Sequence, residues 1–424
     1  MITKLILVVV ALLGAPLFIV IATGAMAGFS QEGIDLAVIP IEIYRLAETP
    51  ILIAIPLFTF AGYLLGESRA PSRLVNFSNV LFGWLPGGLA IMALVTCAIF
   101  TAFTGASGVT IVALGALLFP ALKQAGYSER FNLGLITSSG SLGVLLAPSL
   151  PLILYGVVVQ SLGSEQPVAI DDLFLAGLLP GLLMIVLLSI WSMMHTRQPI
   201  QQEKKYDRND VLVSLRESIW ELPLPFVVLG GIYSGFFAVS EAAAITALYV
   251  LIVEVFVLRE IHIRNLPRIM RESMVMVGGI LIILGVSLAL TNYMIDTEVP
   301  MRLFDTIKSY VDSKYTFLIL LNIFLLILGL MLDIFAALII IVPIIFPIAM
   351  SYGINPVHLG IIFLANMQIG YFTPPVGMNL FIASYRFNRP VMELYRATIP
   401  FFFILLLAVL IITYWPGLSL FLLD

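Results

Sequence analysis

Residues 370–381 read GYFTPPVGMNLF, with two adjacent prolines, Pro374 and Pro375, placed between Gly370 and Gly377. Proline lacks a backbone donor and its ring clashes with the preceding helical turn, so a helix cannot continue through this stretch. The residues on both sides are apolar enough to lie inside a membrane, where an unpaired peptide group finds no water. The sequence therefore predicts a helix that is interrupted at membrane depth.

The whole chain has the composition of a helical membrane protein with many spans. Of its 424 residues, 61% are hydrophobic and 11% are charged, whereas soluble domains have about 25% charged residues. Long apolar runs such as 173–191 and 226–257 recur from end to end, and about 20 such residues span a bilayer as a helix. Barrel strands are shorter and alternate, so an outer-membrane barrel is excluded.

The sequence lacks the residues that several classes of function require. The single cysteine, Cys97, excludes an intrachain disulfide and a cysteine metal site, and it is expected in the core. The three histidines show no metal-ligand spacing, and GxxxxGK[ST], HExxH and GxSxG with a partnered histidine are all absent. We therefore expect no enzymatic activity, no ATP hydrolysis by this chain, no bound cofactor and no nucleic-acid partner.

The chain repeats its backbone-shaping residues at a shift of 227. The matching pairs are Phe119-Pro120 and Phe346-Pro347, Gly126 and Gly353, Gly143 and Gly370, and Pro148 and Pro375. Several matches of glycine and proline at one shift indicate an internal repeat. The residues that break the helix at 370–381 thus have counterparts in GVLLAPSLPLIL at 143–154.

Positive charge predicts how the repeats cross the membrane. Lys and Arg near span ends favour the cytoplasm, so we expect a cytoplasmic N-terminus and place Arg73 and Lys123 on the same side, although a long apolar stretch separates them. That stretch must enter and return as a re-entrant hairpin with its tip at 104–108. The same reasoning gives a second hairpin with its tip at 329–335, for which two ordinary crossings are the alternative.

These observations predict an all-α polytopic membrane protein built from two inverted repeats, each with a re-entrant helical hairpin and a discontinuous transmembrane helix. Such repeats are typical of secondary transporters. The expected segments are a first repeat in 1–196 (scaffold helices 1–70, hairpin 86–125, broken helix 130–160, helix 171–196), a cytoplasmic linker in 197–221, and a connecting helix with the second repeat in 222–424 (scaffold helices 238–295, hairpin 315–351, broken helix 355–384, helix 395–421).

The two broken helices are the candidate binding site. Their free carbonyls and hydroxyls suit an alkali cation such as Na⁺, while half-helix N-termini favour an anion. The alternative is that the small residues only allow close helix packing. The candidates for facing the solute are Ser139, Ser141, Asp333, Pro374, Gly377 and Asn379.

Some polar residues have both a functional and a local interpretation. Asp333 is an acid at membrane depth, which marks a functional site by default, but it is also a suitable N-cap for a helix beginning at Ile334. Glu241 fits ordinary helix capping. Arg45 and Glu48 fit an interfacial arm between the first two helices better than transport.

The motifs TGASGVTIVALG (104–115), GVLLAPSLPLILYG (143–156), GIYSGFFAVSEAAAITALYVLIVE (231–254) and GYFTPPVGMNLF (370–381) resemble the large membrane subunit of tripartite ATP-independent periplasmic (TRAP) transporters. The resemblance implies an elevator-type fold, like that of the ion transporter superfamily, and Na⁺-driven import of small organic anions through the bacterial inner membrane. It also implies two partners: a small four-helix membrane subunit, expected as a separate chain, and a periplasmic solute-binding protein. Membrane lipid surrounds such a subunit.

The resemblance also implies which residues bind sodium. In the second repeat they are Gly329, Leu332, Gly370, Thr373 and Val376. Their counterparts at the repeat shift, with Ser107 added at the first tip, are Ala102, Gly105, Ser107, Gly143, Leu146 and Ser149. Leu146 offers only a carbonyl where Thr373 has a hydroxyl, so the first site is expected to be poorer in hydroxyls.

A stand-alone sodium/organic-anion symporter of related fold is the alternative function. A passive pore would need a continuous polar lining, which the broken helices do not supply. The sequence leaves the solute open among C4-dicarboxylates, sialic acid, sulfonates and ectoine-like compounds.

Overall fold

The computed structural model describes residues 7, 9–10, 13–82, 87–163, 168–195, 208–311 and 313–423. Every regular element in these residues is a helix, which confirms the predicted all-α class. Eight of the described helices are long and apolar enough to cross a membrane, and a ninth span results if the bent pair Glu129–Leu145 and Leu150–Ser161 counts as one. The beginning of the first expected helix, residue 86 of the first hairpin and residues 197–207 of the expected linker lie outside the described residues.

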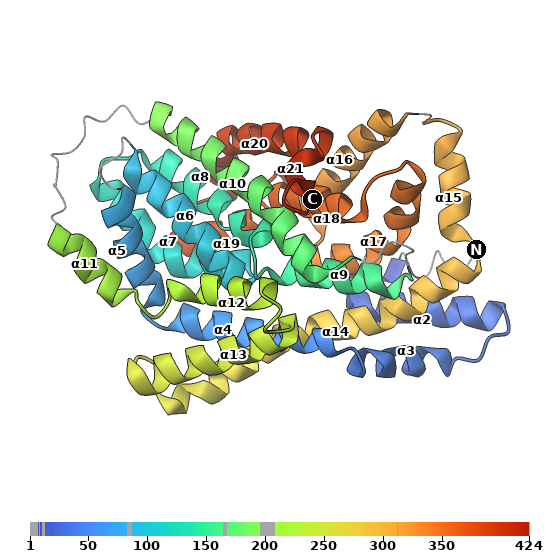
Figure 1. Ribbon diagram of the computed structural model, residues 1–424. Helices are drawn as coiled ribbons and strands as arrows, with labels where there is room; N and C mark the ends of the chain where they lie inside the picture. The colour runs from blue at the N-terminus through green and yellow to red at the C-terminus, as the bar shows by residue number, and fades with distance from the viewer. Residues whose placement is uncertain are drawn as a thin grey trace.

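One set of helices, here called the α14 group, fills the lower part of the molecule in Figure 1. Within it, α14 packs against α2, α3 and α4, and α4 packs against α13. Most of the group falls within 1–70 and 238–295, and its role as a scaffold stays a prediction. Its members are α2 (Leu17–Gln31), α3 (Val38–Ala47), η1 (Pro50–Ile53), α4 (Ala54–Glu67), α12 (Pro223–Tyr233), α13 (Val239–Ile252), η3 (Val253–Val257), η4 (Ile263–Asn265) and α14 (Leu266–Asp296).

The remaining long helices form the upper part of the molecule (Figure 1), and the second half of the chain repeats the element order of the first. Each half has a hairpin, a helix, a break, a second helix and a long final helix. In the first half these are α6 (Gly88–Thr104), α7 (Ser107–Gln124), α8 (Glu129–Ser139), η2 (Leu142–Leu145), α9 (Leu150–Ser161) and α10 (Ile170–His195). In the second they are α16 (Lys314–Met331), α17 (Ile334–Ser351), α18 (Pro356–Gly370), α19 (Met378–Phe387), α20 (Val391–Tyr414) and the short α21 (Gly417–Leu420).

Local geometry recurs 227 residues apart. Gly126 and Gly353 both take positive φ after a hairpin, at +82° and +66°. Two residues further on, the Ser128 side chain accepts from Phe131 N at the start of α8, and Asn355 accepts from Val357 N at the start of α18. These are ordinary N-caps, which satisfy donors left free at a helix start. The inverted relation of the two halves stays a prediction.

The two halves share one core. Helix α9 packs against α17, and α8 packs against α20. The fully buried Tyr155 of α9 donates its hydroxyl to the carbonyl of Pro356 at 2.6 Å. A side chain at Gly360 would collide with the Tyr155 ring. The elements that carry the two breaks are therefore held as a single packed unit.

Three further helices are amphipathic or short, and none of them contains a long apolar run from which it could have been predicted. Helix α5 (Ala70–Phe82) packs on α6, α11 (Arg208–Glu217) lies within the expected linker, and α15 (Val299–Lys308) follows α14.

Polar residues with a local interpretation take local roles. Glu241 accepts from Ala238 N at 2.9 Å, which confirms its capping role. Arg45 pairs with Glu42 at 3.1 Å and is exposed. Cys97 is buried in the core, as expected.

Candidate functional site

The first hairpin tip is a two-residue turn, Gly105-Ala106, between α6 and α7. Gly105 takes φ +64°, a left-handed conformation that glycine adopts at little cost. A Cβ at this position would lie 2.5 Å from Leu150 Cδ1, so the tip is pressed against the start of α9. Helix α7 begins at Ser107, and no side chain caps its N-terminus.

The second tip, Leu332-Asp333, carries an acid instead. Asp333 Oδ1 accepts from Phe335 N at 2.8 Å and from Ala336 N at 3.2 Å. The N-cap interpretation of Asp333 is thereby confirmed. The next amide, Ile334 N, donates to the hydroxyl of Tyr371 at 2.6 Å, which joins this tip to the second break.

Each break lies against a hairpin helix of its own half. A Cβ at Gly143 would overlap the backbone of Ala98 and Ala102 in α6, and a Cβ at Gly370 would lie 2.5 Å from Gly329 Cα in α16. The structure thus brings together Gly143 with Ala102, and Gly370 with Gly329, while sodium binding by these residues stays a prediction. Both breaks also begin with the same turn, since Leu146 N donates to Gly143 O and Thr373 N donates to Gly370 O.

Buried hydrogen bonds connect the two halves at this point. Ser107 Oγ donates to Asn379 Oδ1 at 2.7 Å, from the first tip to α19. Ser141 Oγ donates to the carbonyl of Gln368 at 3.2 Å, and these two residues are 227 positions apart. The first tip is therefore bonded to the second half, and the first break is bonded to the end of α18.

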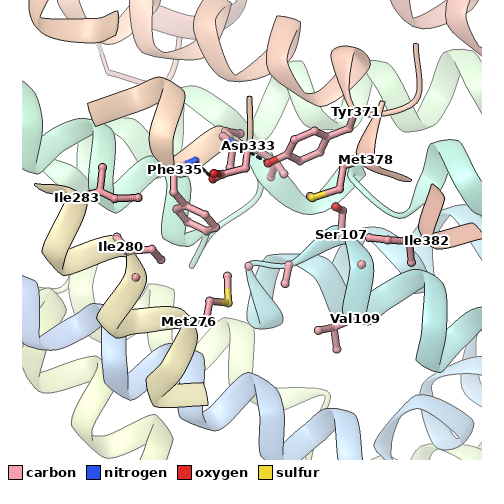
Figure 2. A pocket seen from close by; sticks show the side chains of 16 residues that line it. Ser107, Val109, Met276, Ile280, Ile283, Asp333, Phe335, Tyr371, Met378 and Ile382 are labelled. Atoms are coloured by element: carbon pink, nitrogen blue, oxygen red, sulfur yellow. Dashed lines mark hydrogen bonds between the residues drawn. The ribbon is translucent and has the colours of Figure 1, made fainter. Parts of the chain in front are cut away.

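A cavity of about 450 Å³ lies where the tips meet the α14 group. Figure 2 shows Met276, Ile280 and Ile283 of α14 on one side, with Ser107, Met378 and Ile382 opposite. Asp333 and Tyr371 also line the cavity, as do both tips at Gly105–Val109 and Asp333–Phe335. This volume fits a small organic solute, since ligand pockets begin at about 300 Å³.

The expected solute-facing residues do not all reach this cavity. Asp333 lines it, whereas Ser139, Ser141 and Asn379 are fully buried and are not part of its lining. Gly377 packs against the carbonyl of Tyr371, and Pro374 is half-buried outside the lining. The sequence reasoning missed Tyr371 and the three apolar residues of α14, although Tyr371 stands directly beside Gly370 in the opening motif.

A sodium ion needs oxygen ligands, and side-chain oxygen atoms near the breaks without a described hydrogen-bond partner are the candidates for this role. Ser149 and Thr104 are fully buried, and their hydroxyl oxygens have no hydrogen-bond partner within the described part of the chain. Each precedes one member of the Gly105–Leu150 contact. Buried hydroxyls without partners are rare in folded proteins, so the first half has oxygen ligands available for a cation.

The second half offers oxygen differently. Thr373 Oγ1 already donates to the carbonyl of Ile369 at 2.8 Å, which leaves the oxygen lone pairs. Val376 is 48% exposed, and Leu332, like Leu146 in the first half, is half-buried. The side-chain oxygens at the two breaks are therefore an enclosed serine hydroxyl in the first half and a half-buried threonine hydroxyl in the second.

Comparison with known proteins places the chain among membrane transporters. The model of the family described as "Tripartite ATP-independent periplasmic transporter, DctM component" matches residues 4–418. The C4-dicarboxylate TRAP transporter large permease protein DctM of Pseudomonas aeruginosa is 34% identical over 381 residues, 90% of this chain and 88% of that protein. The ectoine/5-hydroxyectoine TRAP transporter large permease protein UehC of Ruegeria pomeroyi is 31% identical over 422 residues, 99% and 97% of the two chains.

Two other similarities concern a longer permease and a solved structure. The isethionate TRAP transporter permease protein DctMQ of Oleidesulfovibrio alaskensis is 32% identical over 444 residues, which cover 98% of this chain and 69% of that protein. Among solved structures, the YdaH transporter of Alcanivorax borkumensis superposes with a TM-score of 0.60 at 16% identity, over 88% of this chain and 89% of that one. At this identity the likeness concerns the fold alone.

Proposed function

The chain belongs to the DctM family of TRAP transporters, and we propose that it imports a small organic anion together with Na⁺. As a large permease subunit it is a multi-pass protein of the bacterial inner membrane. Relatives are named for C4-dicarboxylates, isethionate and ectoine, and the solute of this chain falls in the same range of small polar acids and zwitterions.

The observation that carries the proposal is the cavity bounded by both hairpin tips. Helix α7 begins at its wall without a capping side chain, and a free helix N-terminus favours an anion. Asp333 on the opposite tip supplies a carboxylate, which favours a cation or a cationic group of the solute nearby. Opposite charges can thus be accommodated in one cavity.

Sodium coupling is supported by the chemistry around the breaks. The hydroxyl of Ser149 and the carbonyl of Gly143 provide oxygen in the first half, with Ala102 and Gly105 beside them. In the second half the same positions are Val376, Gly370, Gly329 and Leu332, with the Thr373 hydroxyl added. An ion at either place would hold a hairpin against its break, and so would shape the solute cavity.

An elevator movement is supported by how the cavity is divided. One wall belongs to α14, and the other belongs to the packed unit that carries both tips and both breaks. The α14 wall is apolar, with Met276, Ile280 and Ile283, so it offers few bonds that would resist sliding. In this proposal the packed unit moves past the α14 group with solute and sodium bound to it.

Two partners complete the proposed transporter. A small four-helix membrane subunit on a separate chain would pack on this subunit, and a periplasmic solute-binding protein would deliver the solute. The partner proposal is supported by the isethionate permease DctMQ, whose sequence extends well beyond the part that this chain matches. A symporter that works alone is the rival.

Uptake by proteoliposomes tests the proposal and separates it from its rival. The permease is reconstituted with its small subunit, and radiolabelled succinate, isethionate or ectoine is added with the loaded binding protein under an inward Na⁺ gradient. We expect uptake only with both the gradient and the binding protein. Sodium coupling would be overturned if uptake stayed the same with equal Na⁺ on both sides of the membrane, or with K⁺ in place of Na⁺. Uptake without the binding protein would favour the stand-alone symporter.

A further inference from the structure

The connection between α13 and α14 forms a second large cavity, far in sequence from the breaks. It is lined by residues of the π-helical turn η3 and of η4 and by the residues between them, and its volume is about 680 Å³. Its lining includes Phe256, Arg259, His262, Ile263, Arg264 and Asn265. In Figure 1 this yellow connection forms the lower left edge of the molecule, so it faces the surroundings of the protein.

The turn between η3 and η4 has a defined backbone conformation. Arg259 takes φ +56°, which is uncommon for a residue other than glycine. The amides of Glu260 and Ile261 both return to the carbonyl of Glu254, at 2.9 and 3.2 Å. The chain therefore reverses tightly at Arg259, and Ile261 is buried beneath the turn.

Acidic and basic side chains of this connection separate onto opposite sides. Glu254 and Glu260 point inward to Arg73 of α5, which also binds Glu221. Glu254 is 1% exposed, and Arg73 Nη2 lies 3.4 Å from its carboxylate. Arg259 and Arg264 are exposed on the outer side, where neither forms an ion pair with a described residue.

Apolar side chains lie exposed next to these two arginines. Phe256 is 56% exposed and Ile263 is 63% exposed. Two candidate membrane spans, Val239–Val257 and Ile263–Asp296, meet at this connection, so it lies at the boundary of the hydrocarbon. Basic clusters at such a boundary mark the cytoplasmic face. A ligand that satisfies both parts carries phosphate at one end and hydrocarbon at the other.

We propose that the cavity at Arg259 and Arg264 binds the phosphate headgroup of an anionic phospholipid, with acyl chains lying over Phe256 and Ile263. Guanidinium groups suit this ligand because they donate two parallel hydrogen bonds to phosphate oxygens. The inward pairing of Glu254 and Glu260 with Arg73 removes the carboxylates that would otherwise neutralise the arginines. The lipid would hold the α13–α14 connection, and with it one end of the α14 group, at a fixed depth.

Lipid-dependent stability of the purified permease, together with its small subunit if the two co-purify, tests this site. Phosphatidylglycerol and phosphatidylcholine with the same acyl chains are added in detergent, and the unfolding temperature is followed as each is titrated. We expect a saturable rise with phosphatidylglycerol and little with phosphatidylcholine. The Arg259→Gln/Arg264→Gln variant should bind phosphatidylglycerol about thirtyfold more weakly, because each arginine near an anionic headgroup contributes to binding.

The matched control is Arg271→Gln/Arg302→Gln, which removes the same charge from two exposed arginines outside the cavity. It should keep the wild-type response. Arg264→Gln alone, which spares the strained turn at Arg259, serves if the double variant does not fold, and it should weaken binding by about fivefold. The proposal is overturned if both lipids act equally, if the cavity variants match the control, or if inorganic phosphate alone reproduces the full rise.

Discussion

The two hairpin tips occupy equivalent positions in the two halves but differ in chemistry. The first tip leaves the N-terminus of α7 without a capping side chain, whereas Asp333 at the second tip caps α17. The breaks behind them differ as well. Ser149 in the first is fully buried and its hydroxyl has no described partner, while Val376 at the equivalent position in the second is exposed.

This difference shows that a repeat preserves backbone shape more strictly than side-chain chemistry. Glycine and proline recur because both halves need the same close approach and the same interruption. The side chains at Ser149 and Val376, or at Ser107 and Ile334, are free to diverge. Under the sodium proposal, the first ion is enclosed by the protein and the second lies nearer to the surroundings.

The largest effect is expected from adding a side chain where each break lies in close contact with a hairpin helix. Gly143→Ala places a methyl group onto the backbone of Ala98 and Ala102, so α6 or the break must move. Overpacking of this kind costs about 3 kcal/mol. We expect a clear fall in unfolding temperature and loss of uptake. Gly370→Ala meets Gly329, which has no side chain of its own, and should cost less, about 2 kcal/mol.

Gly278→Ala is the matched control, since nothing lies within 4 Å of the added Cβ in α14. It should be neutral or slightly stabilising, because alanine favours a helix over glycine by about 1 kcal/mol. A Gly143→Ala variant as stable and active as Gly278→Ala would show that the first break is not tightly packed against α6.

Whether a structural feature could be predicted from the sequence depends on how far apart in the chain the interacting residues lie. The breaks at Pro148 and Pro375 and the tip at Gly105 could be predicted because one residue type dictates the backbone there. The bond between Ser107 and Asn379, and the contact of Arg73 with Glu221 and Glu254, could not, since the partners lie 148 to 272 positions apart in the chain.

The helices also differed in how well they could be predicted from the sequence. The long apolar helices, such as α10 and α20, follow directly from composition. The short α5 and α15 have mixed faces, and only their neighbours in the fold make them helical. For the same reason the cavity wall from α14 was not predicted, although α14 itself was.

The next effect concerns which half binds sodium through a side chain. Ser149→Ala removes a buried hydroxyl without a described protein partner. If it binds Na⁺, the sodium concentration for half-maximal uptake should rise about tenfold, which corresponds to about 1.4 kcal/mol. Thr373→Ala should raise it less, about threefold, because the Thr373 hydroxyl keeps a bond to Ile369 in the wild type.

Ser138→Ala is the control for this pair, because Ser138 is equally buried but its hydroxyl donates to the carbonyl of Gly134 at 2.8 Å. It should leave the sodium dependence unchanged. If Ser149→Ala behaves in the same way and is also more stable, the hydroxyl was merely unsatisfied and the first sodium site is not where we place it. If the Thr373→Ala variant kept the wild-type sodium dependence of uptake, the proposed second sodium site would be wrong.

The smallest expected effect on stability separates the two roles of Asp333. Asparagine caps a helix about as well as aspartate, so Asp333→Asn should unfold at the wild-type temperature, whereas Asp333→Ala should lose about 1 kcal/mol. Both variants remove the carboxylate from the cavity wall, and both should weaken uptake if that charge attracts sodium or the solute. Asn355→Ala, which removes the cap of α18, should lose similar stability and keep its affinity. Full uptake by Asp333→Asn would mean that the second tip carries an acid only to begin a helix, and that the chemical difference between the two tips has no part in transport.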